Sequence, residues 1–168
     1  EMRYSELAQR GAKGDQRIEI SISNTGERTI ATANSSDESP LRISDGPDVA
    51  HYTVGENSFE VSQKSFWQSH KDAPRVLTDA VLQYAQLREG DHVLDLYGGV
   101  GLFAASFLTL IGESGSVDIV EGSKSATADA ARNFEGKSNV NIYTGDVARL
   151  ITRFSSADVI VLDPPREG

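Results

Sequence analysis

Hydrophobic and polar residues alternate in the first third of the chain, which is typical of β-strands. Within residues 17–33, Ile18, Ile20 and Ile22 occupy every second position, the period of a strand with one face toward the protein interior. Gly26 follows in a short polar stretch of the residue types that reverse the chain. We therefore expect residues 17–33 to form a β-hairpin whose isoleucines lie on a half-buried face.

The segment that follows predicts a second hairpin. Residues 34–48 are polar and punctuated by Pro and Gly, and they indicate a connection. Residues 51–54 and 58–62 predict two strands that turn at residues 55–57. Residues 1–64 are therefore expected to form a small β-rich segment, whose pattern alone indicates no function.

From about residue 65 the apolar spacing changes to that of strands alternating with helices. Strands are expected at residues 92–98, 117–122, 139–145 and 158–165, and helices at residues 74–89, 102–111, 123–134 and 147–154. Strands that alternate with helices of this length form right-handed βαβ units and a parallel sheet. The predicted fold class is α/β, with residues 65–168 forming an incomplete Rossmann-like domain that has helices on both faces of a parallel sheet.

A glycine-rich loop connects the first of these strands to its helix. Gly99, Gly101 and Ala104 have the G-x-G-x-x-A spacing of a nucleotide-binding turn, in which the backbone can approach a ligand closely. Glu121 ends the next strand, where a carboxylate can accept hydrogen bonds from ribose hydroxyls. A tight turn and a solvated strand end would also explain these residues, but the βαβ context favours an adenosine-containing ligand.

Asp95, at the end of the first strand, helps to distinguish between two candidate classes of ligand. Nicotinamide-binding fingerprints need no acid there, whereas S-adenosylmethionine enzymes have an acid, a short glycine turn and a second acid in this order. Asp146, just after the third strand, is where such enzymes often place a side chain beside the adenine, although an ordinary helix cap is an equally good interpretation. The preferred cofactor is S-adenosyl-L-methionine, and NAD is the alternative.

Composition narrows the class of protein further. The 168 residues contain no cysteine, which excludes disulfides and thiolate metal ligands and fits a cytoplasmic protein. No stretch approaches the roughly 18 apolar residues that a membrane span requires, and the first residues lack a signal-peptide pattern. The net charge of −9 indicates no basic surface for nucleic acid, so an RNA substrate would have to bind mostly elsewhere.

Three motifs together resemble the S-adenosylmethionine-dependent RNA uracil-C5 methyltransferases, which make 5-methyluridine in tRNA and ribosomal RNA. Residues 65–70 (SFWQSH) resemble the family's Phe-x-Gln segment, and residues 94–103 (LDLYGGVGLF) resemble its Leu-Asp-Leu-Tyr-Cys-Gly-x-Gly loop. Residues 163–168 (DPPREG) match its most specific motif, Asp-Pro-Pro-Arg-x-Gly. The resemblance implies a class I methyltransferase fold with strand order 3-2-1-4, a chain that is a fragment, and RNA as the partner of the complete enzyme.

The resemblance also implies which residues contact the cofactor. With the acid and glycines of the loop, the expected cofactor-binding residues are Gln68, Asp95, Tyr97, Gly99, Gly101, Glu121, Asp146 and Asp163. Gln68 would reach in from the segment before the first helix, Tyr97 would pack beside the cofactor, and Asp163 would lie near the reacting centre. Two positions depart from the family: Leu102 replaces a frequent Asn, which removes one contact, and Gly98 replaces a frequent Cys or Ala at little cost.

The residues that would carry out the methyl transfer are absent. In this family a cysteine thiolate adds to C6 of uracil and a carboxylate base later removes the C5 proton, and both lie later in the chain. We therefore assign no catalytic residue and no metal ligand, and expect this chain alone to be inactive. Phe66 and Trp67 could stack on a nucleobase, but an aromatic pair at the entry to a domain is more often part of a core.

Other interpretations stay open. Another class I methyltransferase, acting on cytosine C5 in RNA or on a small molecule, would share the Asp-Pro-Pro motif. A nicotinamide-binding oxidoreductase would share the glycine spacing. A non-catalytic binding module would need neither the glycine spacing nor the Asp-Pro-Pro motif. The strand expected at residues 158–165 would lie at an open edge of the sheet, so we also expect self-association through this strand.

Overall fold

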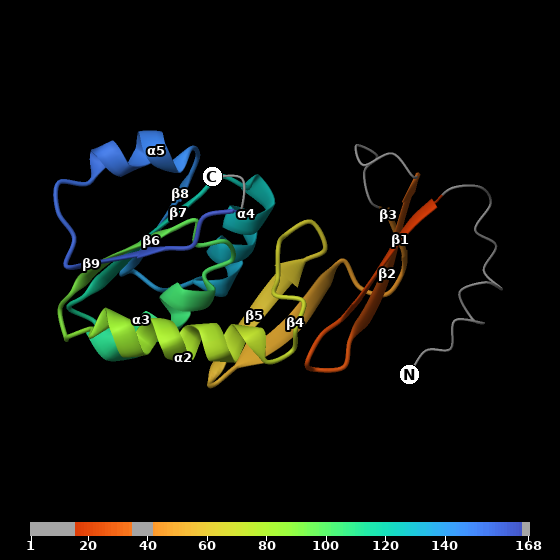
Figure 1. The fold of residues 1–168 in the computed structure, drawn as a ribbon, viewed down its shortest axis with the longest axis horizontal. Coiled ribbons are helices and arrows are strands. Elements are labelled where there is room, and N and C mark those ends of the chain that lie inside the picture. The colour runs from red at the N-terminus through yellow and green to blue at the C-terminus, as the bar shows by residue number, and fades with distance from the viewer. Residues whose placement is uncertain (1–15, 35–41, 166–168) are drawn as a thin grey trace.

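The computed structural model describes residues 16–34 and 42–165. Figure 1 shows a small sheet at one end of the molecule, an α/β part at the other, and a two-stranded hairpin between them. Residues 1–15 and 35–41, within the expected β-rich segment, lie outside the described residues. So do residues 166–168, the last three of the Asp-Pro-Pro-Arg-x-Gly motif.

The N-terminal sheet contains the first expected hairpin. Its strands, β1 (Gln16–Ile22), β2 (Arg28–Asn34) and β3 (Arg42–Asp45), pair antiparallel in the order β1-β2-β3. The hairpin is confirmed, but the expected burial of the isoleucines is wrong for Ile20 and Ile22, which are 40% and 65% exposed. Ile18 is exposed as well. The reason is their position on the edge strand, because Ile30, opposite Ile20 on the central strand, is 5% exposed.

The second expected hairpin packs on the α/β part. It consists of β4 (Val49–Val54) and β5 (Asn57–Ser62), paired antiparallel along their length. Its buried Phe59 shares a hydrophobic core with Val100 and Ala126 of the α/β part. Trp67 packs against the same core, 4.6 Å from the ring of Tyr52 and 5.4 Å from that of Phe59 between centroids, as expected for a core residue.

The α/β part has the expected alternation of strands and helices. Its strands are β6 (His92–Leu96), β7 (Ser116–Glu121), β8 (Val140–Thr144) and β9 (Val159–Leu162), all parallel, in the order β8-β7-β6-β9. Its helices are α2 (Ala73–Ala85), α3 (Leu102–Ile111), α4 (Lys124–Asn133), the single turn α5 (Val147–Leu150) and the 3-10 turn η1 (Ile151–Arg153). This confirms the predicted class and the strand order 3-2-1-4.

Helices cover both faces of the sheet, as Figure 1 shows. On one face Phe107 and Ile111 of α3, both fully buried, pack against Val117 and Ile119 of β7 together with residues of α2 and α4. On the other face Val147 and Leu150 of α5, together with Phe154, pack over the strand residues that point the opposite way, among them Leu96. The alternation along each strand therefore supplies two separate cores, one on each face of the sheet.

Two helices end differently from the sequence expectation. The first helix ends at Ala85 rather than near Gly90, because Gln86 adopts a left-handed conformation with φ of 49° and Leu87 then packs against the core. The helix expected at residues 147–154 is one α-turn followed by a 3-10 turn. No helix among the residues described is long and apolar enough to cross a lipid bilayer.

Candidate functional site

Four carboxyl groups lie at the carboxyl ends of the four parallel strands, the edge at which open α/β sheets bind ligands. Asp146 follows β8, Glu121 ends β7, Asp95 is near the end of β6, and Asp163 follows β9. Since these strands are neighbours in the sheet, the fold brings together four acids that are up to 68 positions apart in the sequence. Figure 1 shows this edge facing the hairpin β4–β5.

The glycine loop between β6 and α3 adopts backbone conformations that explain its sequence. Gly101 has φ of 90°, and a Cβ atom there would lie 2.2 Å from the ring of Phe134, so the close approach requires glycine. A Cβ on Gly98 would lie 2.8 Å from the Ile119 side chain, so the absence of the family's Cys or Ala suits this structure. Tyr97 has φ of 61°, a conformation that a non-glycine residue adopts at a cost and that is concentrated at functional sites.

Glu121 joins the loop to the start of α4. Its Oε2 accepts a hydrogen bond from the Gly99 N–H at 3.0 Å, and its Oε1 accepts one from the Ser123 N–H at 2.6 Å. A carboxylate has about four acceptor positions, so two remain available. Glu121 therefore both shapes the loop and keeps acceptor capacity for the two hydroxyls of a ribose.

Asp95 is the buried member of the four acids. Its side chain is 1% exposed, and its Oδ2 accepts a hydrogen bond of 3.2 Å from the Ala104 N–H in the first turn of α3. Burial raises the pKa of Asp95 to about 7, the hydrogen bond from Ala104 opposes that rise, and the charges of Asp163 and Glu121 add to it. The carboxyl of Asp95 therefore lies close enough to both acids for their negative charges to raise its pKa.

Asp163 and Asp146 are exposed at the same edge. The Asp163 N–H donates a hydrogen bond of 3.4 Å to the Leu96 carbonyl, which continues the pairing of β9 with β6 beyond the strand. Asp146 accepts a hydrogen bond of 2.9 Å from the Arg149 N–H and caps α5. The helix-cap interpretation of Asp146 is thus confirmed, and its location leaves the cofactor interpretation possible as well.

Gln68 lies in a different setting from the other expected site residues. Together with Phe66 and Lys71 it lines a groove of about 690 Å³ between β1 and the segment that leads to α2. Phe66 is 73% exposed, in contrast to its neighbour Trp67 in the core. Gln68 is half-buried and forms no hydrogen bond with another described residue, so no hydrogen bond joins it to the glycine loop.

The structure also reveals a contact that the sequence did not indicate. Asn133, the last residue of α4, donates a hydrogen bond of 3.1 Å from Nδ2 to the carbonyl of Val100 in the glycine loop. Its Oδ1 accepts a hydrogen bond of 2.8 Å from the Glu60 N–H on β5. A lone Asn near the end of a predicted helix carries no pattern, so only the tertiary structure could show this contact.

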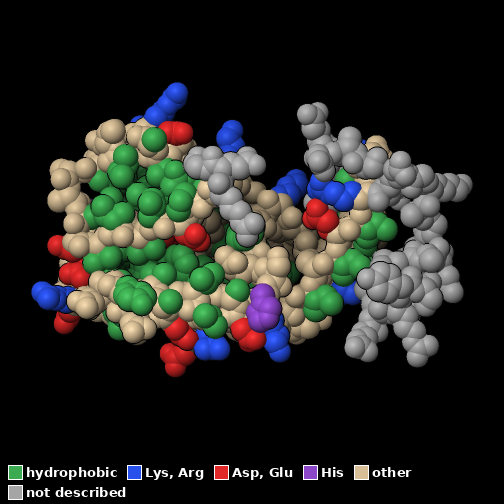
Figure 2. All heavy atoms as spheres, in the orientation of Figure 1, with side chains coloured by type: hydrophobic (Ala, Val, Ile, Leu, Met, Phe, Trp, Pro, Cys, Tyr) green, Lys and Arg blue, Asp and Glu red, His purple; other side chains and the backbone are tan. Residues whose placement is uncertain are grey.

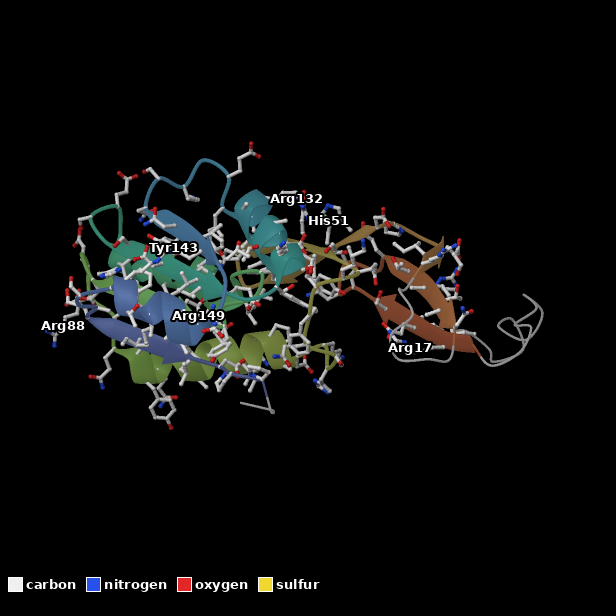
Figure 3. All side chains as sticks on the ribbon, turned by 90° about the horizontal axis from the view of Figure 1, so that it is seen from above. Arg17, His51, Arg88, Arg132, Tyr143 and Arg149 are labelled. Carbon is white, nitrogen blue, oxygen red and sulfur yellow. The ribbon has the colours of Figure 1, made fainter. Side chains whose placement is uncertain are left out.

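The described residues contain no group of three or more His, Asp or Glu side chains placed to hold a metal ion. Figure 3 shows Arg132 and His51 where α4 meets the hairpin β4–β5, and Arg149 on α5. Arg132 pairs with Glu60 and Asp129 at that junction. The carboxyl edge of the sheet thus carries four acids and a glycine loop, and no metal cluster among the described residues.

Comparison of the sequence with known proteins finds methyltransferases that share this part of the chain. Residues 51–163 match the family model of protein-L-isoaspartate(D-aspartate) O-methyltransferases. An uncharacterized RNA methyltransferase of Streptomyces coelicolor is 40% identical over 115 residues, which are 67% of this chain and 25% of that protein. The 23S rRNA (uracil(1939)-C(5))-methyltransferase RlmD of Psychrobacter arcticus is 35% identical over 117 residues, or 66% of this chain and 23% of that protein. The chain thus spans about a quarter of the length of these relatives.

A solved structure shows the same fold. The tRNA (uracil-54, C5)-methyltransferase of Pyrococcus abyssi, determined in complex with S-adenosyl-L-homocysteine, has a TM-score of 0.60 at 23% identity and covers 80% of this chain and 33% of that one. The family model and the relatives differ in the acceptor they name, because the matched residues form the part of the domain that methyltransferases share. The chain belongs to the S-adenosylmethionine-dependent methyltransferases, the class that the family model represents, and its curated relatives are named RNA methyltransferases.

Proposed function

We propose that this chain binds S-adenosylmethionine and forms the methyl-donor half of an enzyme that methylates C5 of uridine in RNA. The observation that supports this most is the grouping of Asp95, Glu121, Asp146 and Asp163 around one glycine loop at the carboxyl edge of the sheet. Neither the loop nor any single acid would be specific alone. Their arrangement on neighbouring strands supports a ligand that has both a ribose and a positive charge.

The charge of this edge suits S-adenosylmethionine better than a dinucleotide. When bound, S-adenosylmethionine supplies an electrophilic methyl group on a positively charged sulfonium, and its amino-acid end carries an ammonium group. The charges of Glu121 and Asp163 reach Asp95 and raise its pKa, so this edge attracts a cation and disfavours the pyrophosphate of NAD. The residues present therefore fit S-adenosylmethionine.

Each acid has a role that its location supports. Glu121 would accept hydrogen bonds from the ribose hydroxyls while it keeps those from Gly99 and Ser123. Asp146 would lie beside the adenine, and Tyr97 and Asp163 would flank the methionine end. The amide of Gln68 is not used in hydrogen bonds within the described part of the chain, so it is available for the cofactor or the substrate.

The uridine part of the proposal depends on the relatives. RlmD of Psychrobacter arcticus, 35% identical, acts on uracil C5 according to its name. Carbon 5 of uracil is a poor nucleophile, and the family resemblance implies that a cysteine thiolate first adds to C6. The 168 residues contain no cysteine. The thiolate and the base that completes the reaction would therefore come from residues outside this chain.

Methylation of an isoaspartyl carboxylate is a second candidate, supported by the family model that matches residues 51–163. A carboxylate attacks a methyl sulfonium directly and needs no covalent intermediate. The two candidates therefore differ in the acceptor and in the need for a thiolate. They share the same cofactor site.

Calorimetry tests cofactor binding. We expect S-adenosylmethionine and S-adenosylhomocysteine to bind more tightly than NAD, and tighter binding of NAD would overturn the proposal. Replacing Glu121 with Ala should cost about 1–3 kcal/mol of binding free energy, the range for lost hydrogen bonds to a charged group. Glu113, an exposed acid in the turn after α3, provides a matched control, because Glu113→Ala should leave the affinity unchanged.

The acceptor is tested separately with the complete protein. RNA labelled with tritium at C5 of uridine should release tritium when methylation occurs, and an isoaspartyl peptide should accept no methyl group. The 168-residue chain alone should show neither reaction. Methylation of the peptide without tritium release would favour the second candidate.

A further inference from the structure

Asn133 connects the glycine loop, 33 positions before it in the sequence, with strand β5, 73 positions before it. Its Nδ2 binds the carbonyl of Val100, and its Oδ1 binds the N–H of Glu60 on β5. One half-buried amide thus holds the glycine loop at one atom and the hairpin β4–β5 at the other.

The glycine loop is held from two sides. The Gly99 N–H is bound to Glu121, which we propose as the ribose ligand. One residue later the Val100 carbonyl is bound to Asn133, and the Val100 side chain is 3% exposed in a core formed mainly by β4 and β5. The peptide that faces the proposed ligand therefore has its orientation set by Asn133 and the hairpin.

We propose that Asn133 is a positioning residue of the cofactor site, and that the hairpin β4–β5 acts through it as a supporting part of that site. The inference rests on the proposed binding of S-adenosylmethionine. Asn133 acts on the glycine loop and not on the cofactor itself. Its loss should let the loop leave the conformation in which the Gly99 N–H and Glu121 are set for a ribose.

The substitution Asn133→Asp separates the two contacts. It keeps the oxygen that accepts from Glu60 and replaces the donor to Val100 with a carboxylate oxygen, which the carbonyl repels. Asn139→Asp is a matched control with the same chemistry, because Asn139 Nδ2 donates to the carbonyls of Gly112 and Gly115, next to the opposite edge of the sheet.

The readouts are the affinity for S-adenosylhomocysteine by calorimetry and the thermal midpoint, each at pH 8 and pH 4 in the full chain. At pH 8, Asn133→Asp should bind about ten-fold more weakly than wild type, as expected for a lost hydrogen bond that leaves a carbonyl unpaired. At pH 4, near the ordinary pKa of an Asp carboxyl, roughly half of the introduced groups are protonated and can donate to Val100 again, so the ratio to wild type should move back toward one. Asn139→Asp should lower the thermal midpoint and leave the affinity unchanged at both pH values.

A folded Asn133→Asp protein that binds as wild type does would overturn the inference, and so would equal losses of affinity in both variants. If Asn133→Asp does not fold, Asn133→Ala at pH 8 carries the same comparison with Asn139→Ala. Absence of S-adenosylhomocysteine binding by the wild type would instead show that the proposed function fails, and the inference with it.

Discussion

Replacing Asp95 with Asn is expected to stabilise the protein at neutral and alkaline pH. The side chain is buried beneath the glycine loop, with one hydrogen bond from the Ala104 N–H to offset the loss of water. An Asn side chain has nearly the same shape, and its carbonyl oxygen can still accept this hydrogen bond. The substitution therefore removes a buried charge and keeps the packing.

The magnitude follows from the pKa of Asp95, which rises from 3.8 to about 7 on folding. Below pH 3.8 the carboxyl is neutral in both the folded and the unfolded chain, and its full contribution to stability is present. Between pH 3.8 and about 7 the unfolded chain releases the proton while the folded chain keeps it, so stability falls as the pH rises. At 1.36 kcal/mol for each pH unit, the loss is about 4 kcal/mol at pH 8.

Urea unfolding of wild type and Asp95→Asn across pH 5 to pH 8 measures this effect. The free energy of unfolding of the wild type should fall relative to that of the variant as the pH rises. Asp158→Asn is the control, because Asp158 is exposed at the opposite edge of the sheet, where it accepts a hydrogen bond from the His92 N–H. Parallel curves for wild type and Asp95→Asn would refute the reasoning, since they would mean that Asp95 titrates alike in both states.

Two further predictions concern packing and the open edge of the sheet. Gly101→Ala should cost more than about 2 kcal/mol of unfolding free energy, because the new Cβ would meet the ring of Phe134. Gly136→Ala is the control: Gly136 has φ of 80° and open space around it, so this substitution should cost only the backbone strain of about 1 kcal/mol. Leu162→Lys should abolish concentration-dependent association in sedimentation experiments, because β9 is an edge strand whose Ile160 and Leu162 are 54% and 59% exposed. Figure 2 shows hydrophobic side chains gathered over this edge, between α2 and α5; a wild type that stays monomeric at all concentrations would contradict the second prediction.

The α/β part could be predicted from the sequence because each of its elements carries a local signal. The strands are short apolar runs, and the side chain of Ser123 caps α4 by accepting a hydrogen bond from the Ala126 N–H, as its position suggested. The parallel arrangement then follows from chain connectivity. Since carboxyl ends of parallel strands share one edge, the grouping of Asp95, Glu121 and Asp163 also follows from strand assignments alone.

The burial of the first strand could not be predicted in the same way. Alternation identifies a strand with one apolar face, and that part of the expectation holds for Ile18, Ile20 and Ile22. It does not tell whether the strand lies at the centre or the edge of its sheet. In this structure the central position belongs to β2, so Ile30 is buried while Ile22 on the edge strand is exposed.

The support of the glycine loop shows a second limit of local patterns. The sequence pattern assigns the hairpin β4–β5 to the β-rich segment, whereas in the structure side chains of α4 hold this hairpin against the α/β part. Asp129 accepts hydrogen bonds from the N–H and the hydroxyl of Ser62, and Arg132 pairs with Glu60. These contacts join residues about 70 positions apart, and their geometry depends on how α4 lies on the sheet. Consequently, the sequence indicates where a ligand would meet the loop, while the residues that hold the loop in place emerge only from the packing of α4 against the hairpin.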